Sequence, residues 1–192
     1  MRAYTAQTGF TLTELLVTVA ILGIFSGLSI ATFGRNWRDE RVKAATRETA
    51  GWLEEARRVA IQTSTPCRVT INRATATLTI DPDAGDNYTY CEEDRLQPLS
   101  LRSTDKGTND LQLCTLELTT SDPASYSLPC TGAQSGSISL RFTPRGTAID
   151  GTLIKIHLDQ ANADRCIAVM SPLGQIRSGR ATTTGCDFTT AF

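Results

Sequence analysis

The stretch from Phe10 to Phe33 constrains this chain more than any other feature of its sequence. It contains a single charged residue, Glu14, within a run of apolar and small side chains. As an α-helix it would be roughly 36 Å long, which exceeds the about 30 Å of hydrocarbon in a bilayer. It is longer than the apolar region of a conventional secretory signal, and no Ala-x-Ala site follows it. The sequence therefore predicts a transmembrane helix over residues 10–34.

The charges that flank this stretch and the cysteines that follow it predict opposite orientations of the helix in the membrane. Only Arg2 precedes it, whereas four basic residues follow closely: Arg35, Arg38, Arg41 and Lys43. Counted alone, these charges place the C-terminal side in the cytoplasm. All six cysteines lie on that side, without a Cys-x-x-Cys pair and with His157 as the only histidine, so a zinc site lacks its usual ligands. Disulfides are favoured over the alternative of free buried thiols, and disulfides persist in the periplasm or outside the cell.

Glu14 is unusual because a carboxylate at membrane depth is unfavourable unless it has a partner. Alternatively, it lies close enough to the interface to stay hydrated. The hexapeptide Gly9-Phe10-Thr11-Leu12-Thr13-Glu14 heads the apolar stretch after a short polar leader. This arrangement resembles the class III signal of type IV prepilins.

The resemblance implies a processing site and an assembly residue. In the type IV pilin family a dedicated peptidase cleaves after the glycine on the cytoplasmic face, and the new N-terminus is methylated. This implies a leader over residues 1–9, cleavage between Gly9 and Phe10, and methylation of Phe10. The family's assembly role falls on Glu14, paired with the terminal ammonium of a neighbouring subunit, a pair in which losing one partner costs far more than losing both. Because family members keep the globular part outside, the resemblance reverses the orientation given by the charges.

A second, amphipathic helical region is predicted over residues 35–65. Apolar or small residues recur there at spacings of three and four, at Val42, Ala45, Thr49, Trp52, Ala56 and Val59. This face, with Trp52, is expected to pack on a sheet rather than to bind a ligand. Thr65-Pro66 ends the helix, because a residue before proline avoids the helical region. One helix from about Thr11 to Ser64 would be about 80 Å long.

A β-rich head is predicted over residues 66–192. Period-two patterns with many β-branched residues predict a hairpin of strands 67–71 and 74–80 around Asn72-Arg73, and further strands at 111–118, 137–142, 153–158, 165–170 and 175–178. The predicted fold class is α+β, a long N-terminal helix with a membrane half and an amphipathic half packed on an antiparallel sheet. Residues 81–135 resemble no known segment.

The C-terminal part resembles the GspH/FimT family, which comprises minor pseudopilins of type II secretion and minor pilins of type IV pili. The resemblance rests on the Ser-Pro-x-Gly turn and basic strand within residues 166–179, and on Phe142-Thr143-Pro144-Arg145-Gly146 before it. A Cys166–Cys186 disulfide would connect this closing hairpin to the C-terminal tail. Proximity in sequence suggests Cys67–Cys91 and Cys114–Cys130, although six cysteines allow 15 pairings.

The sequence contains no recognisable set of catalytic residues. There is no Gly-x-Ser-x-Gly elbow, and alternation places His157 beside Lys155 on the polar face of a strand, facing solvent rather than acting as a general base. Residues 174–181 have the glycine spacing of a phosphate-binding loop, but Arg180-Ala181 stands where Lys-Ser/Thr is required. We expect no enzyme activity, no cofactor and no metal.

DNA binding is an alternative function for the closing hairpin. Some family members bind DNA through a Gly-Arg-x-Arg motif there; here Gln175 replaces the first arginine, Arg177 remains, and Arg165 and Arg180 are near in sequence. Arginines on one hairpin could hold phosphates in a salt-sensitive way, whereas a solvated surface is the simpler interpretation. The net charge of −1, from 19 basic and 20 acidic residues, gives no general reason to bind nucleic acid.

The predicted function is therefore structural. The resemblances imply a minor pilin or pseudopilin that assembles into or primes a type IV pilus or a type II secretion pseudopilus. They imply a single-pass inner-membrane protein with its head in the periplasm or at the cell surface. Its partners would be other pilin or pseudopilin subunits and the prepilin peptidase. A pilus-tip DNA receptor for natural transformation is the alternative.

Overall fold

The structure is a computed structural model that divides into two compact units, Met1–Trp37 and Arg38–Phe192. It describes residues 9–82, 90–92, 95–102, 111–118, 124, 126, 128, 130, 135–159, 161, 164–182 and 185–189, with the backbone alone for residues 27–35. Residues 1–8 of the predicted leader, and most of the stretch 81–135 that resembles nothing known, lie outside the described residues.

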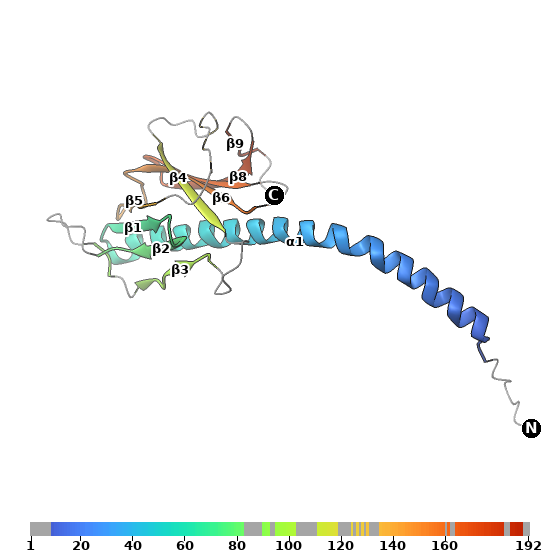
Figure 1. The fold of residues 1–192 in the computed structure, drawn as a ribbon. Helices are drawn as coiled ribbons and strands as arrows, with labels where there is room; N and C mark the ends of the chain where they lie inside the picture. Colours follow the sequence, from blue (N-terminus) through green and yellow to red (C-terminus); the bar gives the residue numbers. More distant parts are fainter. Residues whose placement is uncertain are drawn as a thin grey trace, which may run out of the picture. The chain divides into compact units, whose positions relative to one another are not determined.

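A single helix, α1, comprises Leu12–Thr63 (Figure 1), which confirms the predicted helix to within a residue at each end. Thr11 caps it, because its Oγ1 accepts a hydrogen bond from the backbone N–H of Glu14 at 3.3 Å. Glu14 also places a negative charge in the first turn, where it complements the helix dipole. The helix ends where Ser64 takes a positive φ of 54°, just before Thr65-Pro66.

The face of α1 predicted to be buried is buried in the second unit. All six residues of the predicted stripe, from Val42 to Val59, are at most 9% exposed. Thr46, Leu53 and Ala60 join them, although the pattern did not single them out. Trp52 lies in the core, and its Nε1 donates a hydrogen bond to the carbonyl oxygen of Gln97 at 2.8 Å. Trp52 is therefore part of the seam between helix and strands, as expected.

The strands are antiparallel, as predicted for the head, and form two sheets (Figure 1). The four-stranded sheet has the order β3-β2-β1-β5, built from β1 (Cys67–Asn72), β2 (Thr77–Ile80), β3 (Leu99–Ser100) and β5 (Ser137–Phe142). The five-stranded sheet has the order β4-β6-β7-β8-β9, built from β4 (Gln112–Leu118), β6 (Gly151–His157), β7 (Arg165–Met170), β8 (Gln175–Ala181) and β9 (Cys186–Asp187).

The five-stranded sheet has a core on each of its faces. Ile167 and Val169 of β7 belong to a large cluster that also contains the buried face of α1 and the four-stranded sheet. Cys166 and Ala168, which alternate with them, belong to a smaller cluster with Cys114 and Leu128 on the other face. Alternate residues of a strand point to opposite faces, so β7 is buried on both sides along nearly its whole length.

Several predicted strand limits are wrong. β2 begins at Thr77 rather than at residue 74, because Asn72 Oδ1 accepts hydrogen bonds from the backbone N–H groups of Ala74 and Thr75 and holds them in a turn. β8 continues to Ala181 instead of ending at residue 178. The two-residue strands β3 and β9 were not predicted, because so short a run has no readable period.

Two glycine turns meet beside the last turns of α1. Gly146 and Gly174 have φ values of +76° and +65°, which L side chains rarely adopt. A Cβ on Gly174 would collide with the carbonyl oxygen of Gly146. The N–H of Ala148 donates to Pro172 O at 3.1 Å, and Arg57 Nε of α1 donates to Gly146 O at 2.7 Å. The two segments that carry the GspH/FimT resemblance, residues 142–146 and 166–179, are thus in contact.

Candidate functional site

The predicted cleavage site lies in an open part of the chain. Gly9 and Phe10 precede the first residue of α1 and are both exposed, Phe10 by 82%. A Cβ added to Gly9 would meet nothing within 4 Å. The Gly9–Phe10 peptide bond is therefore accessible to another protein.

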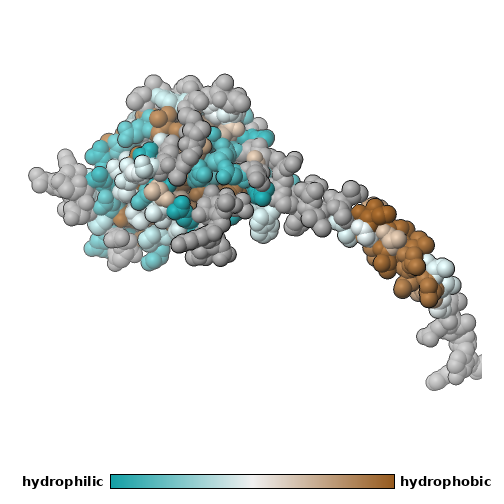
Figure 2. Space-filling model, in the orientation of Figure 1, coloured by the Kyte–Doolittle hydropathy of each residue, from teal (hydrophilic) through white to brown (hydrophobic). Residues whose placement is uncertain are grey.

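The first turns of α1 present their apolar side chains outward (Figure 2). Each large hydrophobic residue from Leu12 to Phe25 is at least 47% exposed: Leu12, Leu15, Leu16, Val17, Val19, Ile21, Leu22, Ile24 and Phe25. Thr18 and Ser26 donate their hydroxyls to the carbonyl oxygens of Leu15 and Leu22, both at 2.8 Å, so these polar groups need no outside partner. Within the described residues, no helix has both the length and the apolar character needed to cross a membrane.

Glu14 is the single charged residue of this apolar surface. Its backbone N–H takes part in the cap at Thr11, and its side chain is exposed. In the described part of the chain no basic group pairs with its carboxylate. Phe10, where cleavage would create an ammonium, is four residues before Glu14 in the sequence and precedes α1.

The arginines of the candidate DNA site are both on β8 but on opposite faces. In the β7–β8 register Arg177 pairs with Ala168, whereas Arg180 pairs with Arg165. Ala168 belongs to the smaller core cluster, and Arg165 shares a face with Ile167 and Val169 of the larger one. The structure therefore does not bring Arg177 and Arg180 together on one surface.

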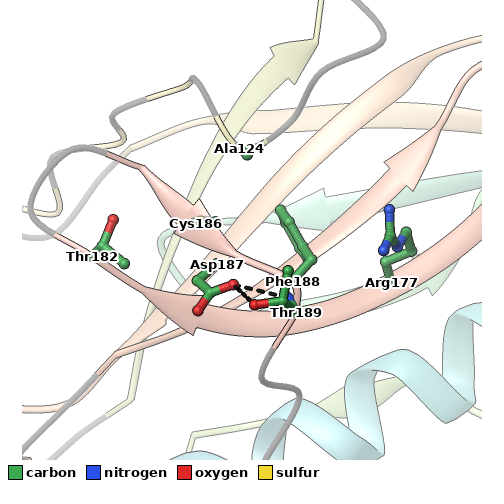
Figure 3. A pocket seen from close by; sticks show the side chains of 7 residues that line it. All are labelled: Ala124, Arg177, Thr182, Cys186, Asp187, Phe188 and Thr189. Atoms are coloured by element: carbon green, nitrogen blue, oxygen red, sulfur yellow. Dashed lines mark hydrogen bonds between the residues drawn. The ribbon is translucent and has the colours of Figure 1, made fainter.

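Arg177 lines a shallow pocket at the edge of the five-stranded sheet (Figure 3). The pocket has a volume of about 370 Å³ and is lined by Ala124, Arg177, Thr182, Cys186, Asp187, Phe188 and Thr189. The Arg177 guanidinium carbon lies 5.9 Å from the ring centre of Phe188, a cation–π distance. Asp187 Oδ1 accepts hydrogen bonds from the N–H and the hydroxyl of Thr189.

Among the described residues of the head, Arg165 is the buried arginine, at 8% exposed. Burial lowers the pKa of Arg165, and the positive charges of Arg180 and Arg47 lower it further, while Asp39 and Glu40 of α1 act in the opposite direction. Sequence reasoning placed Arg165 near the hairpin but not in the interior, because only the sheet register shows which side of β7 it occupies.

His157 belongs to a charged cluster at the end of β6. Its Nδ1 lies 2.7 Å from Asp164 Oδ1 and its Nε2 lies 3.1 Å from Asp159 Oδ1. Lys155 Nζ lies 3.0 Å from Asp164 Oδ2. With both ring nitrogens engaged, the histidine serves as a structural contact and is more enclosed than the solvent-facing position predicted for it. Among the described residues no group of three or more potential ligands could hold a metal ion.

A second polar pocket, of about 270 Å³, lies where β1, β4 and β5 meet the start of β6, and is lined by Arg68, Glu117, Ser139, Arg141 and Asp150. Arg141 Nε and Nη2 donate to the two carboxylate oxygens of Asp150 at 3.1 and 3.4 Å. This hydrogen-bonded carboxylate raises the pKa of Arg141. The pocket therefore contains a structural ion pair between Arg141 and Asp150.

All six cysteines are paired: Cys67 with Cys91, Cys114 with Cys130, and Cys166 with Cys186. These are the three pairs suggested from the sequence. Cys67–Cys91 attaches the start of β1 to the segment before β3, and Cys114–Cys130 attaches β4 to the segment before β5. Cys166–Cys186 joins β7 to β9 across β8. Two of the disulfides thus connect a strand to a segment between strands, and the third connects two strands.

Comparison with known proteins finds a family match at the N-terminal end of the chain and a similarity to solved structures. Residues 4–30 match the family described as the prokaryotic N-terminal methylation motif, while no curated protein matches. In structure the chain is similar to the minor pseudopilin EpsH of the type 2 secretion system of Vibrio cholerae, in one structure with 15% identity, 73% of this chain and 97% of that chain covered, and a TM-score of 0.47. A second EpsH structure has 14% identity, covers 73% and 94%, and has a TM-score of 0.48.

It is likewise similar to the type IV minor pilin FimU of Pseudomonas aeruginosa, at 14% identity, with 80% of this chain and 96% of that chain covered and a TM-score of 0.46. The N-terminal match contains Gly9, Phe10 and Glu14, the residues on which the prepilin resemblance rests. Residues 4–30 of the chain thus carry the prokaryotic N-terminal methylation motif.

Proposed function

We propose that this protein is a minor pilin or pseudopilin, a subunit that assembles into or primes a type IV pilus or a type II secretion pseudopilus. The observation that carries the proposal is the exposed apolar surface between Leu12 and Phe25, preceded by the open Gly9–Phe10 bond. Exposed apolar surfaces of this extent are sites of contact with membrane or protein. A lipid bilayer before assembly, and the corresponding helices of other subunits after it, would cover this surface.

Glu14 would provide the register of assembly. Cleavage after Gly9 would create an ammonium on Phe10, four residues before Glu14 in the sequence, and this ammonium would be available to the Glu14 carboxylate of a neighbour. In an apolar surrounding each charge is strongly unfavourable alone, and a pair between subunits removes both penalties. A subunit out of register by one residue would leave both groups unpaired.

The proposed location follows from the two ends of the chain. The N-terminal segment would be processed by prepilin peptidase at the inner membrane, while the head, with its three disulfides, would lie in the periplasm or on the outside of the cell. The protein would act by contact with other pilin or pseudopilin subunits and not by catalysis.

The proposal is tested by the fate of the Gly9–Phe10 bond in cells that contain a prepilin peptidase. The mature chain should begin at methylated Phe10, as measured by intact mass and N-terminal sequencing. Gly9→Val should remain uncleaved. Gly23→Val is the matched control, because a Cβ at either glycine meets nothing within 4 Å, and it should be processed normally. A mature wild-type chain that retains residues 1–9 would contradict the proposal.

A further inference from the structure

Trp37 is the feature of α1 that the proposed function leaves unexplained. The chain has two tryptophans, and the other, Trp52, is 9% exposed in the core with its Nε1 hydrogen-bonded to the carbonyl oxygen of Gln97. Trp37 is 67% exposed, and within the described residues its Nε1 has no acceptor. A single exposed apolar side chain is common on proteins, so the position of Trp37 along the helix decides what covers it.

The position of Trp37 follows from the length of the helix before it. From Leu12 to Trp37, α1 is about 38 Å long at about 1.5 Å per residue. This length exceeds the roughly 30 Å of hydrocarbon in a bilayer but stays within the roughly 40–45 Å that include both headgroup regions. A helix that begins at one interface of the bilayer therefore brings Trp37 to the other interface.

The sequence changes from apolar to charged at the same point. The apolar stretch ends at Phe33, and Trp37 is followed by four charged residues at positions 38–41. The buried face of the helix begins at Val42. Trp37 thus lies between the exposed apolar surface of the first turns and the face that the strands cover, and it belongs to neither.

We propose that Trp37 lies in the headgroup region of the membrane, at the interface on the side of the head. Tryptophan is enriched at membrane–water interfaces because the indole combines a large apolar ring with one polar N–H. The ring of Trp37 would lie against lipid, and its Nε1 would find water or headgroup oxygens as acceptors. This assignment rests on the proposed membrane anchor, and it adds the depth to which α1 is inserted in the bilayer.

The test uses the full chain in phosphatidylcholine vesicles that carry a nitroxide quencher either on the lipid headgroup or near the end of the acyl chain. The headgroup nitroxide should lower the tryptophan emission of the wild type by up to half, because one of the two tryptophans is within its reach, and the acyl-chain nitroxide should lower it less. Trp37→Phe should lose this quenching, since the remaining Trp52 is buried in the head. Trp37→Phe combined with Gln62→Trp is the matched control. It restores an exposed tryptophan on the same helix, about 38 Å further along, and should not be quenched.

Insertion is measured separately in each sample, by flotation of the vesicles after an alkaline wash. If the wild type is inserted but its emission is the same with and without the headgroup quencher, the interface position of Trp37 is overturned, its exposed ring is left for another subunit to cover, and the membrane anchor stands. Stronger quenching by the acyl-chain nitroxide would also overturn the interface position, because Trp37 would then lie within the hydrocarbon. A chain that does not float with the vesicles would overturn both the interface position and the membrane anchor. None of these outcomes depends on cleavage after Gly9 or on filament formation.

Discussion

The two parts of helix α1 bury their apolar faces differently. Between Leu12 and Phe25 the large apolar side chains are exposed, whereas between Val42 and Ala60 the apolar face lies in the core with strands from both sheets. Helical geometry alone is the same in both parts. The difference shows that an apolar helix face needs another apolar surface to cover it. In the head, the strands of the same chain cover it, whereas between Leu12 and Phe25 another molecule has to do so.

The largest expected effect on stability comes from truncating one leucine in each of the two parts of α1. Leu53 is fully buried and Leu16 is 63% exposed. Leu53→Ala should lower the free energy of unfolding of the head by about 2–5 kcal/mol, while Leu16→Ala should change it by less than about 0.5 kcal/mol. Urea titration followed by tryptophan fluorescence measures both, because Trp52 lies in the core. Equal losses would show that the first part also packs within its own chain.

The disulfides of the head should have the next largest effect. Cys166 and Cys186 are 20 residues apart in sequence, and a loop of that length is worth about 3 kcal/mol in the chain-entropy model. The double variant Cys166→Ala with Cys186→Ala should lower the free energy of unfolding of the head by that order, as measured by denaturant titration. Thiol labelling of the folded wild type before reduction is the control, and substantial free thiol would refute the disulfides.

The contact between the two glycine turns gives a smaller, matched comparison. Gly174→Ala introduces a Cβ against the backbone oxygen of Gly146, whereas Gly136→Ala, also at positive φ, meets only the mobile end of Arg73. Both variants carry a backbone strain of about 1–2 kcal/mol, so the excess loss of stability in Gly174→Ala measures the packing of the turns. Thermal unfolding should show a lower Tm for Gly174→Ala. Identical Tm values would mean that the turns yield without loss.

Glu14→Ala should leave the stability of the head unchanged and reduce incorporation into filaments. The charge lies outside the head, so unfolding should shift by less than about 0.5 kcal/mol, but the Phe10 ammonium of a neighbour loses its partner. The measurement is the amount of the protein in sheared filaments relative to membranes, with the exposed Thr13→Ala as control. Equal incorporation of wild type and Glu14→Ala would remove the assembly role from Glu14.

The smallest expected effect concerns DNA. Because Arg177 and Arg180 lie on opposite faces of β8, we expect the full chain to bind DNA weakly or not at all at physiological salt, and Arg177→Gln with Arg180→Gln to change little. Gln175→Arg adds a charge on the face of Arg177 and should strengthen any binding. Fluorescence anisotropy with a labelled duplex measures this. Micromolar binding that the double variant abolishes would instead support DNA uptake.

Much of the fold could be predicted because its signals are local. The buried stripe from Val42 to Val59 follows from the period of a helix, and its end follows from Thr65-Pro66. The alternation in β1, β4 and β5 likewise marked strands close to their observed limits. The candidate N-terminal site was found in the same way, since Gly9, Phe10 and Glu14 lie next to or within the apolar helix. The prepilin resemblance depends on these residues and that helix together.

By itself the sequence determined one long helix, a β-rich head, and a candidate processing segment in front of them, because periodicity and turn chemistry act over a few residues. Only the tertiary structure decided that the strands form two sheets, that β3 and β9 exist, and that β7 is buried on both faces. It also decided that Arg165 and Arg180 face each other while Arg177 points away. Each of these depends on which distant strands pair and in which register, and a shift of one residue in register would exchange the faces.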